Sequence, residues 1–226
     1  MTKRAGGSTA RPTSLGVLGV LGVLGALGLG LTGCGLGDDG DAEKPDATKS
    51  GPYDPAKAVR TKADVRAMLP GDGEVPGGWE DAVDGPKALS GHYAERYCGS
   101  WAGKGCSKAL VMGETSYAYD GNVNFRILTF ADKSAARAAY RGVFATEEST
   151  GERTPGKAQR VGSESRTLRA SGDRADAVTI LRVGTVVARV NSYLNGPGPD
   201  GDEVAAMQAD RIAQVLRGEK PTATLR

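Results

Sequence analysis

The stretch Leu110-Val-Met-Gly-Glu-Thr-Ser-Tyr-Ala-Tyr-Asp-Gly-Asn-Val-Asn-Phe-Arg-Ile-Leu-Thr-Phe130 decides the fold, because it predicts a β-hairpin. Asp120-Gly121 separates two apolar-rich runs, and an Asp-Gly pair favours a tight turn in which both residues take a positive φ. The second run alternates apolar and polar residues, as a half-buried strand does. Its apolar face consists of Val123, Phe125 and Ile127. We therefore expect this hairpin to be part of an antiparallel sheet.

The rest of the folded region predicts further strands and helices around this hairpin. The expected elements are a short helix over 61–69, a helix over 132–148, a polar loop over 150–157, a weak strand over 165–170, paired strands over 177–183 and 185–193, and a last helix over 202–217. In the 132–148 helix, capped by Asp132, an apolar stripe is typical of a core-facing surface. The stripe is formed by Ala136, Tyr140, Val143 and Phe144. Strand pairs alternating with single helices predict an α+β fold, an antiparallel sheet built from hairpins with helices packed on it.

The first 33 residues have the pattern of a secretory signal peptide. Lys3, Arg4 and Arg11 precede a 17-residue run over 15–31 that carries no charge, and a basic start followed by an apolar run is typical of such signals. A glycine stands at every third position from Gly16 to Gly28. Each interior glycine costs a helix about 1 kcal/mol relative to alanine, so we expect a transient export signal rather than a lasting transmembrane anchor.

The residues that end this run, Leu31-Thr32-Gly33-Cys34, resemble the lipobox of bacterial lipoproteins. The resemblance implies that Cys34 carries a diacylglyceryl group, that cleavage precedes Cys34, and that the protein is lipid-anchored at the extracytoplasmic face of the cell membrane. Two acyl chains matter because a single chain gives only marginal, reversible membrane binding. The alternative is a soluble secreted protein in which Cys34 has no such role.

Three regions follow from this pattern: a lipoprotein signal peptide over 1–33, a lipidated cysteine with a disordered tether over 34–56, and a single folded domain over 57–226. Residues 35–55 are acidic, rich in Gly and Pro and nearly free of apolar side chains, a composition that does not order by itself. The whole chain has 29 basic and 27 acidic residues, but Lys3, Arg4 and Arg11 lie in the leader, so residues 34–226 carry a formal charge of −1. A near-neutral mature chain argues against nucleic acid as a partner, because nucleic-acid binding needs a clustered cationic face.

Cys98 and Cys106 remain as a pair once Cys34 is committed to lipid. In an oxidising compartment an even pair predicts a disulfide, here closing a short glycine-rich loop that contains Trp101. A metal-binding pair is the alternative, but no histidine or third cysteine lies nearby in the sequence. Loss of two mass units on oxidation would distinguish the disulfide from the metal site.

No motif in the sequence predicts catalysis, a cofactor or a metal. Gly-x-Gly-x-x-Gly occurs over 28–33, 35–40 and 196–201, but none of these stretches lies within the βαβ unit that dinucleotide binding requires. His92 is the only histidine, and it stands beside no nucleophile motif. Glu114, inside a predicted strand, is the best carboxylate candidate for a cell-envelope hydrolase, although a solvent-facing role explains it as well. We therefore predict a protein that is not an enzyme and binds neither cofactor nor metal.

Aromatic and basic side chains in the middle of the chain suggest a binding surface. Trp101, Tyr117 and Arg126 form a candidate ligand groove, because ligand sites combine aromatic walls with a few polar groups. The alternative is that Trp101 packs against the disulfide.

The order of several short motifs resembles the PknH-like extracellular sensor domain family, found on actinobacterial surface lipoproteins and some membrane kinases. The motifs are Leu69-Pro70, Pro76-Gly77-Gly78-Trp79, Cys98, Trp101, Cys106, Phe130-Ala131-Asp132, Val161-Gly162-Ser163-Glu164-Ser165 and Leu181-Arg182-Val183-Gly184-Thr185-Val186-Val187-Ala188-Arg189-Val190. The family commonly has Asp at the position of Ser163 and Asn at that of Thr185. The resemblance covers roughly residues 60–218 and implies an α+β domain with a cleft.

The resemblance also implies a non-catalytic, ligand-binding or sensing role. The expected partners are the membrane, through the Cys34 anchor, and an unidentified small molecule, peptide or envelope protein. A protein-interaction or envelope-assembly factor is the alternative function, followed by a cell-envelope hydrolase.

Overall fold

The computed structural model describes residues 54, 57–106, 108–157, 160–170, 175–195 and 199–225. The chain divides into two units, 1–44 and 45–226, and every described residue lies in the second. The predicted signal peptide, Cys34 and all of the predicted tether except Asp54 therefore lie outside the described residues. Within the described part of the chain, no helix has the length and apolar character needed to cross a bilayer.

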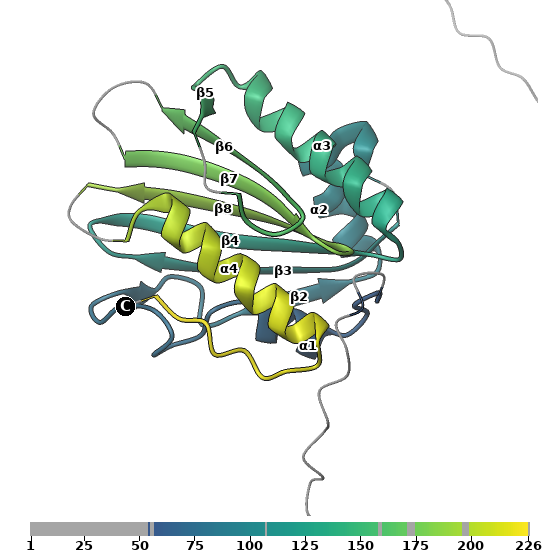
Figure 1. Ribbon diagram of the computed structural model, residues 1–226, viewed down its shortest axis with the longest axis horizontal. Helices are drawn as coiled ribbons and strands as arrows, with labels where there is room; N and C mark the ends of the chain where they lie inside the picture. Colours follow the sequence, from purple (N-terminus) through teal and green to yellow (C-terminus); the bar gives the residue numbers. More distant parts are fainter. Residues whose placement is uncertain are drawn as a thin grey trace, which may run out of the picture. The chain divides into compact units, whose positions relative to one another are not determined.

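One antiparallel sheet of eight strands forms the centre of the described fold (Figure 1). Its strand order is β1-β3-β4-β8-β7-β6-β5, and β2 also pairs with β3. The strands are β1 (Glu80–Asp81), β2 (Lys87–Ser90), β3 (Ala109–Ala118), β4 (Gly121–Phe130), β5 (Arg153–Gly156), β6 (Glu164–Ala170), β7 (Ala175–Val183) and β8 (Val186–Leu194).

The two predicted hairpins are confirmed and lie side by side in the sheet. Asp120 and Gly121 have φ values of 35° and 138°, so both take the positive φ that the Asp-Gly turn was expected to need. Gly184, with a φ of 59°, occupies the turn between β7 and β8. Pairing of β4 with β8 joins the hairpins, which makes β4, β8 and β7 interior strands.

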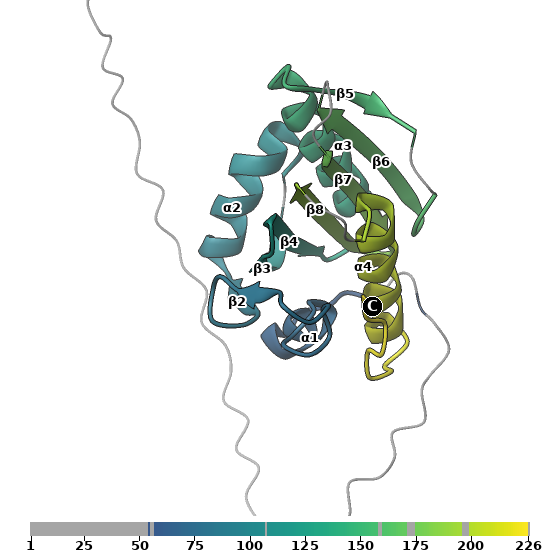
Figure 2. The same ribbon diagram turned by 90° about the vertical axis from the view of Figure 1, so that its left-hand side faces the viewer.

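Helices cover both faces of the sheet (Figures 1 and 2). The helices are α1 (Lys62–Met68), α2 (His92–Ala102), α3 (Lys133–Ser149) and α4 (Gly201–Leu216), followed in the case of α2 by a 3-10 turn, η1 (Gly103–Gly105). The α2 and α3 helices lie against one face, and α1 and α4 lie against the other. The Asp132 side chain accepts a hydrogen bond from the Ala135 amide and caps α3, while Asp200 and Glu203 form a capping box at the start of α4.

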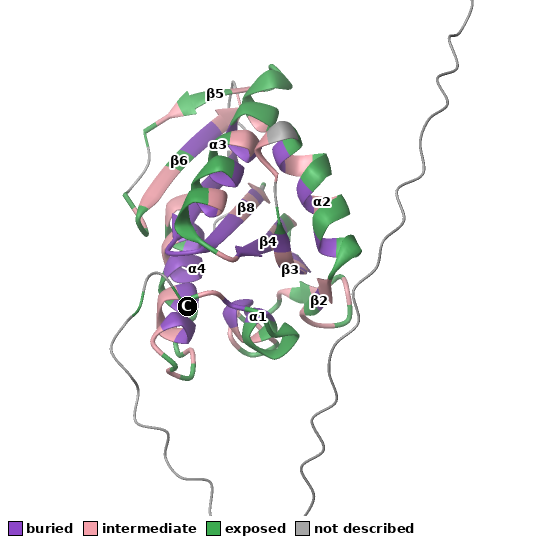
Figure 3. Ribbon diagram, turned by 90° about the vertical axis from the view of Figure 1, so that its right-hand side faces the viewer, coloured by how far each residue is buried: buried purple, intermediate pink, exposed green. Residues whose placement is uncertain are grey.

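Because successive strand residues point to opposite faces, the sheet divides the core into two clusters. Phe125 and Ile127 pack on the α1/α4 side, whereas Met112, Leu128 and Phe130 pack on the α2/α3 side. The predicted apolar stripe of α3 is buried, and Figure 3 shows this buried face turned toward the sheet. The predicted α+β class, with helices packed on an antiparallel sheet, is confirmed.

Two segments differ from the sequence-based expectation. The first half of the expected glycine-rich loop between Cys98 and Cys106 is the end of α2, which begins at His92, and the expected polar loop over 150–157 contains β5. Pro155 lacks an amide to donate, and it is accommodated because β5 is an edge strand that pairs only with β6. Both expectations were wrong because packing against the sheet outweighs the weak local signals.

The predicted disulfide between Cys98 and Cys106 is present, with 5.5 Å between the two Cα atoms. It links α2 to the segment entering β3 and so holds the helix against the sheet. Gly142 on α3 allows the close approach of the two helices here, because a Cβ at this position would overlap the Ala102 carbonyl oxygen.

Candidate functional site

Two of the three expected groove residues meet on the α2/α3 face. The Arg126 guanidinium carbon lies 5.1 Å from the ring centroid of Trp101, a cation–π contact between β4 and α2. Glu114, opposite Arg126 on β3, places its Oε2 atom 3.6 Å from Arg126 Nε. The candidate carboxylate for hydrolysis is thus engaged by a cation on the neighbouring strand.

Tyr117, the third expected groove residue, does not lie beside Trp101 and Arg126. Its side chain is buried in the core on the α1/α4 side, and its hydroxyl donates to the Pro70 carbonyl at 2.9 Å. Tyr117 is three residues beyond Glu114 on β3, and an odd separation along a strand reverses the face. The groove expected from Trp101, Tyr117 and Arg126 must therefore be corrected to a contact between Trp101 and Arg126 alone.

His92 is exposed at the first position of α2, where its ring lies 4.0 Å from that of Tyr93, centroid to centroid. Across the described part of the chain, no group of three His, Cys, Asp or Glu side chains is placed to hold a metal ion.

A charge network between the C-terminal end of α3, β5, β7 and β8 links two arginines to two carboxylates. Glu147 Oε1 lies 2.6 Å from Arg189 Nε, and Glu147 Oε2 lies 3.9 Å from Arg153 Nη1. Arg153 also donates to Asp176 at 2.8 Å. All four side chains are between 13% and 17% exposed. We call these four residues the paired network, since each charge has an opposite partner.

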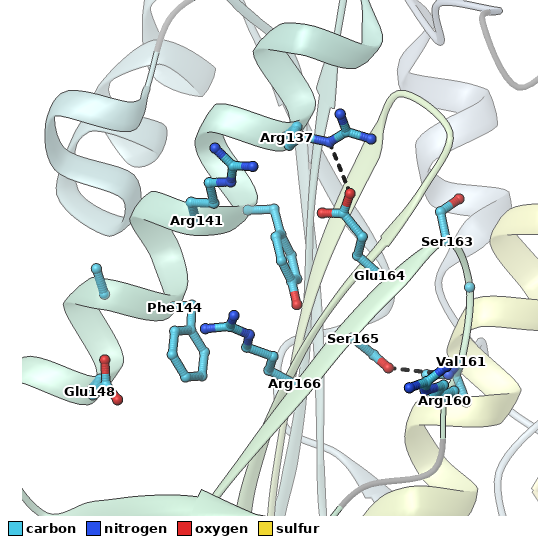
Figure 4. A pocket seen from close by; sticks show the side chains of 13 residues that line it. Arg137, Arg141, Phe144, Glu148, Arg160, Val161, Ser163, Glu164, Ser165 and Arg166 are labelled. Atoms are coloured by element: carbon cyan, nitrogen blue, oxygen red, sulfur yellow. Dashed lines mark hydrogen bonds and ion pairs between the residues drawn. The ribbon is translucent and has the colours of Figure 1, made fainter.

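A cleft of about 680 Å³ lies between α3, β6 and the segment 160–163 (Figure 4). We call it the α3–β6 cleft. Its lining residues are Arg137, Tyr140, Arg141, Phe144, Ala145, Glu148, Arg160, Val161, Gly162, Ser163, Glu164, Ser165 and Arg166. A smaller hollow of about 370 Å³ shares Phe144, Arg160 and Arg166 with it and extends toward Pro155. The volume falls within the range of ordinary small-molecule sites.

Helical spacing explains the α3 wall of the cleft. Arg137, Arg141 and Ala145 recur every four residues, and residues four apart lie one above another on a helix. Tyr140 and Phe144 form the adjacent row and are only 6% and 7% exposed. The cleft thus has a cationic rim beside a mostly buried aromatic floor.

Glu164 is the carboxylate that two arginines hold inside the cleft. Its Oε1 atom accepts from Arg137 Nε at 2.9 Å and from Arg182 Nη2 at 3.1 Å. Burial raises the pKa of this carboxyl, but the hydrogen bonds and positive charges of Arg182 and Arg137 outweigh it, so its pKa is lowered. Glu164 is therefore an ionised partner for both arginines at neutral pH.

Three other arginines of the cleft have no such partner. Among the described residues, no carboxylate lies within ion-pair distance of Arg141, Arg160 or Arg166. The Arg166 guanidinium carbon lies 4.7 Å from the ring centroid of Phe144, and Figure 4 shows this side chain reaching from β6 toward α3. These three residues, which we call the free arginines, make the cleft a candidate anion site.

Tyr140 adds a neutral donor. Burial raises the pKa of its phenol, which Arg166 opposes only in part. Its hydroxyl thus stays protonated at neutral pH and makes no hydrogen bond to a described residue.

Sequence reasoning missed the cleft because it assigned Tyr140 and Phe144 to the core and gave no role to the neighbouring arginines. The available signal was the pair Arg137 and Arg141, four apart beside an apolar stripe. The pairing of α3 with β6 could not be read from that signal.

The lining of the cleft contains no histidine and no cysteine, so it offers neither an imidazole base nor a thiol nucleophile. No family model matches this chain, and neither does any curated protein.

Proposed function

We propose that this protein is a membrane-anchored, extracytoplasmic lipoprotein whose folded domain is a non-catalytic ligand-binding or sensing module. The observation that carries the binding role is the α3–β6 cleft, in which free arginines stand over an aromatic floor. Fixed cations beside apolar surface are what a small-molecule site needs, because the apolar part supplies affinity and the charges supply orientation.

The sequence resemblance to PknH-like extracellular sensor domains supports the sensing role. That family has Asp at the position of Ser163, and Ser163 lines the cleft. Serine here removes a carboxylate from a wall that already contains Glu164. We propose that this chain has kept the binding module and changed its preference toward more negatively charged ligands.

The lipobox-like residues before Cys34 support the location. Export followed by acylation of Cys34 would hold the domain close to the outer surface of the cytoplasmic membrane, with residues 34–56 as the tether. A carrier or receptor in that position meets ligands of the envelope before they reach the bilayer.

Binding is tested with the full chain extracted from membranes in detergent. A library of neutral, cationic and anionic small molecules is screened by thermal shift, and hits are measured by calorimetry with the wild type and with Ala145→Trp, in which a bulky side chain fills the cleft from an exposed position. We expect at least one hit whose affinity falls more than tenfold in the variant. Absence of any hit that responds to Ala145→Trp contradicts the binding role.

Location is tested separately by fractionating cells that express the wild type or Cys34→Ala. We expect the wild type in the membrane fraction, with a mass that shows acylation and removal of residues 1–33. The variant should lack the acyl mass and keep its leader. Wild-type protein in the cytosol with an intact leader would contradict the anchoring proposal without bearing on the cleft.

A further inference from the structure

The charge of the α3–β6 cleft is unbalanced. Four arginines and two glutamates line it, which leaves a net formal charge of +2. Glu164 is already bound by Arg137 and Arg182, whereas the exposed Glu148 pairs with no described cation. The three free arginines are therefore available to a ligand, and the net charge of the lining balances a group with two negative charges.

Arg166 is held in a geometry that suits an oxyanion. The Arg166 guanidinium carbon lies 4.7 Å from the ring centroid of Phe144, and a cation–π contact of this kind limits the rotamer freedom of the side chain before any ligand arrives. A guanidinium also presents the planar fork that binds phosphate with two parallel hydrogen bonds. Lysine could not replace it in this arrangement, because an ammonium lacks the plane and the fork.

The remaining polar groups of the cleft are donors without charge. The protonated Tyr140 hydroxyl lies in the same lining, as does the hydroxyl of Ser163. A phosphate offers three acceptor oxygens, more than a carboxylate, and so matches several donors at once. The aromatic floor of Tyr140 and Phe144 then faces whatever carries the phosphate.

We propose that the α3–β6 cleft binds phosphate monoesters, with Arg141, Arg160 and Arg166 holding the dianionic phosphate and the floor of Tyr140 and Phe144 contacting a flat or apolar organic body. This inference rests on the proposed binding function and gives it a ligand class. The dianion is the feature that separates a monoester from the singly charged phosphate diesters of most membrane lipids.

The probes are phenyl phosphate, phenyl sulfate, phenol and inorganic phosphate, titrated into the detergent-extracted full chain by calorimetry at pH 7.5. We expect phenyl phosphate to bind best and phenyl sulfate, a monoanion of similar shape, about tenfold more weakly. Phenol should bind weakest because it lacks the anion. The affinity of inorganic phosphate should fall between those of phenyl phosphate and phenol because it lacks the ring.

Substitutions of the free arginines test whether phenyl phosphate binds in the α3–β6 cleft. Arg166→Gln should weaken phenyl phosphate binding more than tenfold, and Arg141→Gln and Arg160→Gln severalfold each. Arg60→Gln is the control, since Arg60 is exposed and lines none of the clefts named here. The free arginines are exposed and make no ion pair with a described carboxylate, so these variants should keep the wild-type melting temperature, which separates lost binding from lost folding.

Two short-chain lipids below their micelle concentration identify the source of the monoester. Dihexanoyl phosphatidic acid carries a monoester and dihexanoyl phosphatidylglycerol a diester. Binding of the first alone, lost in Arg166→Gln, supports a lipid monoester, and binding of phenyl phosphate with neither lipid supports a soluble one.

Equal affinity for phenyl phosphate and phenol, or unchanged binding in all three arginine variants, overturns the phosphate inference. If phosphate probes fail while another ligand class responds to Ala145→Trp, only this inference fails and the binding module stands. If no ligand of any class responds, the proposed function fails as well.

Discussion

The paired network and the free arginines both lie beside α3 but differ in whether their charges are neutralised within the protein. In the network, Glu147, Arg189, Arg153 and Asp176 balance one another and are at most 17% exposed. In the α3–β6 cleft, Arg141 and Arg160 stay exposed without a described carboxylate partner. Two neighbouring residues of α3 thus have different surroundings, since Glu147 belongs to the network and Glu148 lines the cleft.

The difference follows from desolvation. A charge that leaves water loses several kcal/mol of hydration and must regain it from a partner, so the network is complete within the protein. The free arginines keep their water and need no partner for stability. They can exchange that water for a ligand, which the network cannot do. Paired, buried charge therefore stabilises the fold, and the unpaired, accessible charge beside an aromatic floor is the feature on which we base the proposed binding site.

The largest effect is expected from breaking the network at Glu147. Glu147→Gln leaves Arg189 and part of Arg153 without a counter-charge in a mostly buried setting, so unfolding should become easier by about 3 kcal/mol. Urea denaturation followed by circular dichroism measures this. Glu148→Gln, the same change one residue later on an exposed side chain, is the matched control and should shift stability by less than about 0.5 kcal/mol. Equal losses in both variants would abolish the distinction between the two regions.

Glu164 lines the cleft but is paired with two arginines, Arg137 and Arg182, and it predicts a pH dependence. Its folded-state pKa is lowered from the ordinary 4.5, so its contribution is complete above that pH and is lost as the pH falls through the folded-state value. At pH 7, Glu164→Gln should be less stable than the wild type by about 1 kcal/mol, discounted for partial exposure. The gap should close as the pH is lowered well below 4.5. A gap that stays constant from pH 7 to pH 3 would show that Glu164 is not held as an ion by Arg182 and Arg137.

The same substitution should have the opposite effect on binding. Glu164→Gln removes one negative charge from the cleft and releases Arg137, whose Nε donates to Glu164. We expect phenyl phosphate to bind about threefold more tightly, or roughly 0.6 kcal/mol, in calorimetry at low salt. Weaker binding would mean that Glu164 contributes to the site chiefly by positioning Arg137, and would contradict the charge argument.

Local chemistry made the hairpins and the long helices predictable. Asp120-Gly121 can form a turn of one type, and Asp132 followed by an apolar stripe specifies both the start of α3 and its buried face. The disulfide was predicted from the pair of cysteines that remains once Cys34 is assigned to lipid and from the oxidising compartment that this assignment implies. The helix α2 was missed because Gly99 lies inside it and Gly91 and Gly103 flank it, and its stability comes from packing on β3 and from the disulfide of Cys98.

The cleft could not be read from the sequence for a different reason. Its two walls, α3 and β6, are joined only by tertiary packing, and nothing in the local pattern around Arg166 points to Phe144. The orientation of Tyr117 could, in contrast, have been predicted from the sequence. Tyr117 and Glu114 are three residues apart on β3, so their side chains point to opposite faces of the sheet. The groove was predicted from residue types, without asking which face of the sheet each residue occupies.

The smallest expected effect concerns Trp101, where a cation meets an aromatic ring outside both regions. Arg126 already pairs with Glu114, so its contact with Trp101 at 5.1 Å is an addition to a satisfied charge. Arg166, by contrast, lies over the Phe144 ring and pairs with no carboxylate of the described residues. Truncating the cation in Arg126→Met should therefore cost about 0.5 kcal/mol of stability and leave phenyl phosphate binding unchanged, measured by urea denaturation and calorimetry. A loss of phosphate binding in Arg126→Met would place the anion site at the contact between Arg126 and Trp101 instead of in the α3–β6 cleft. The ligand would then bind an arginine that already has a carboxylate partner.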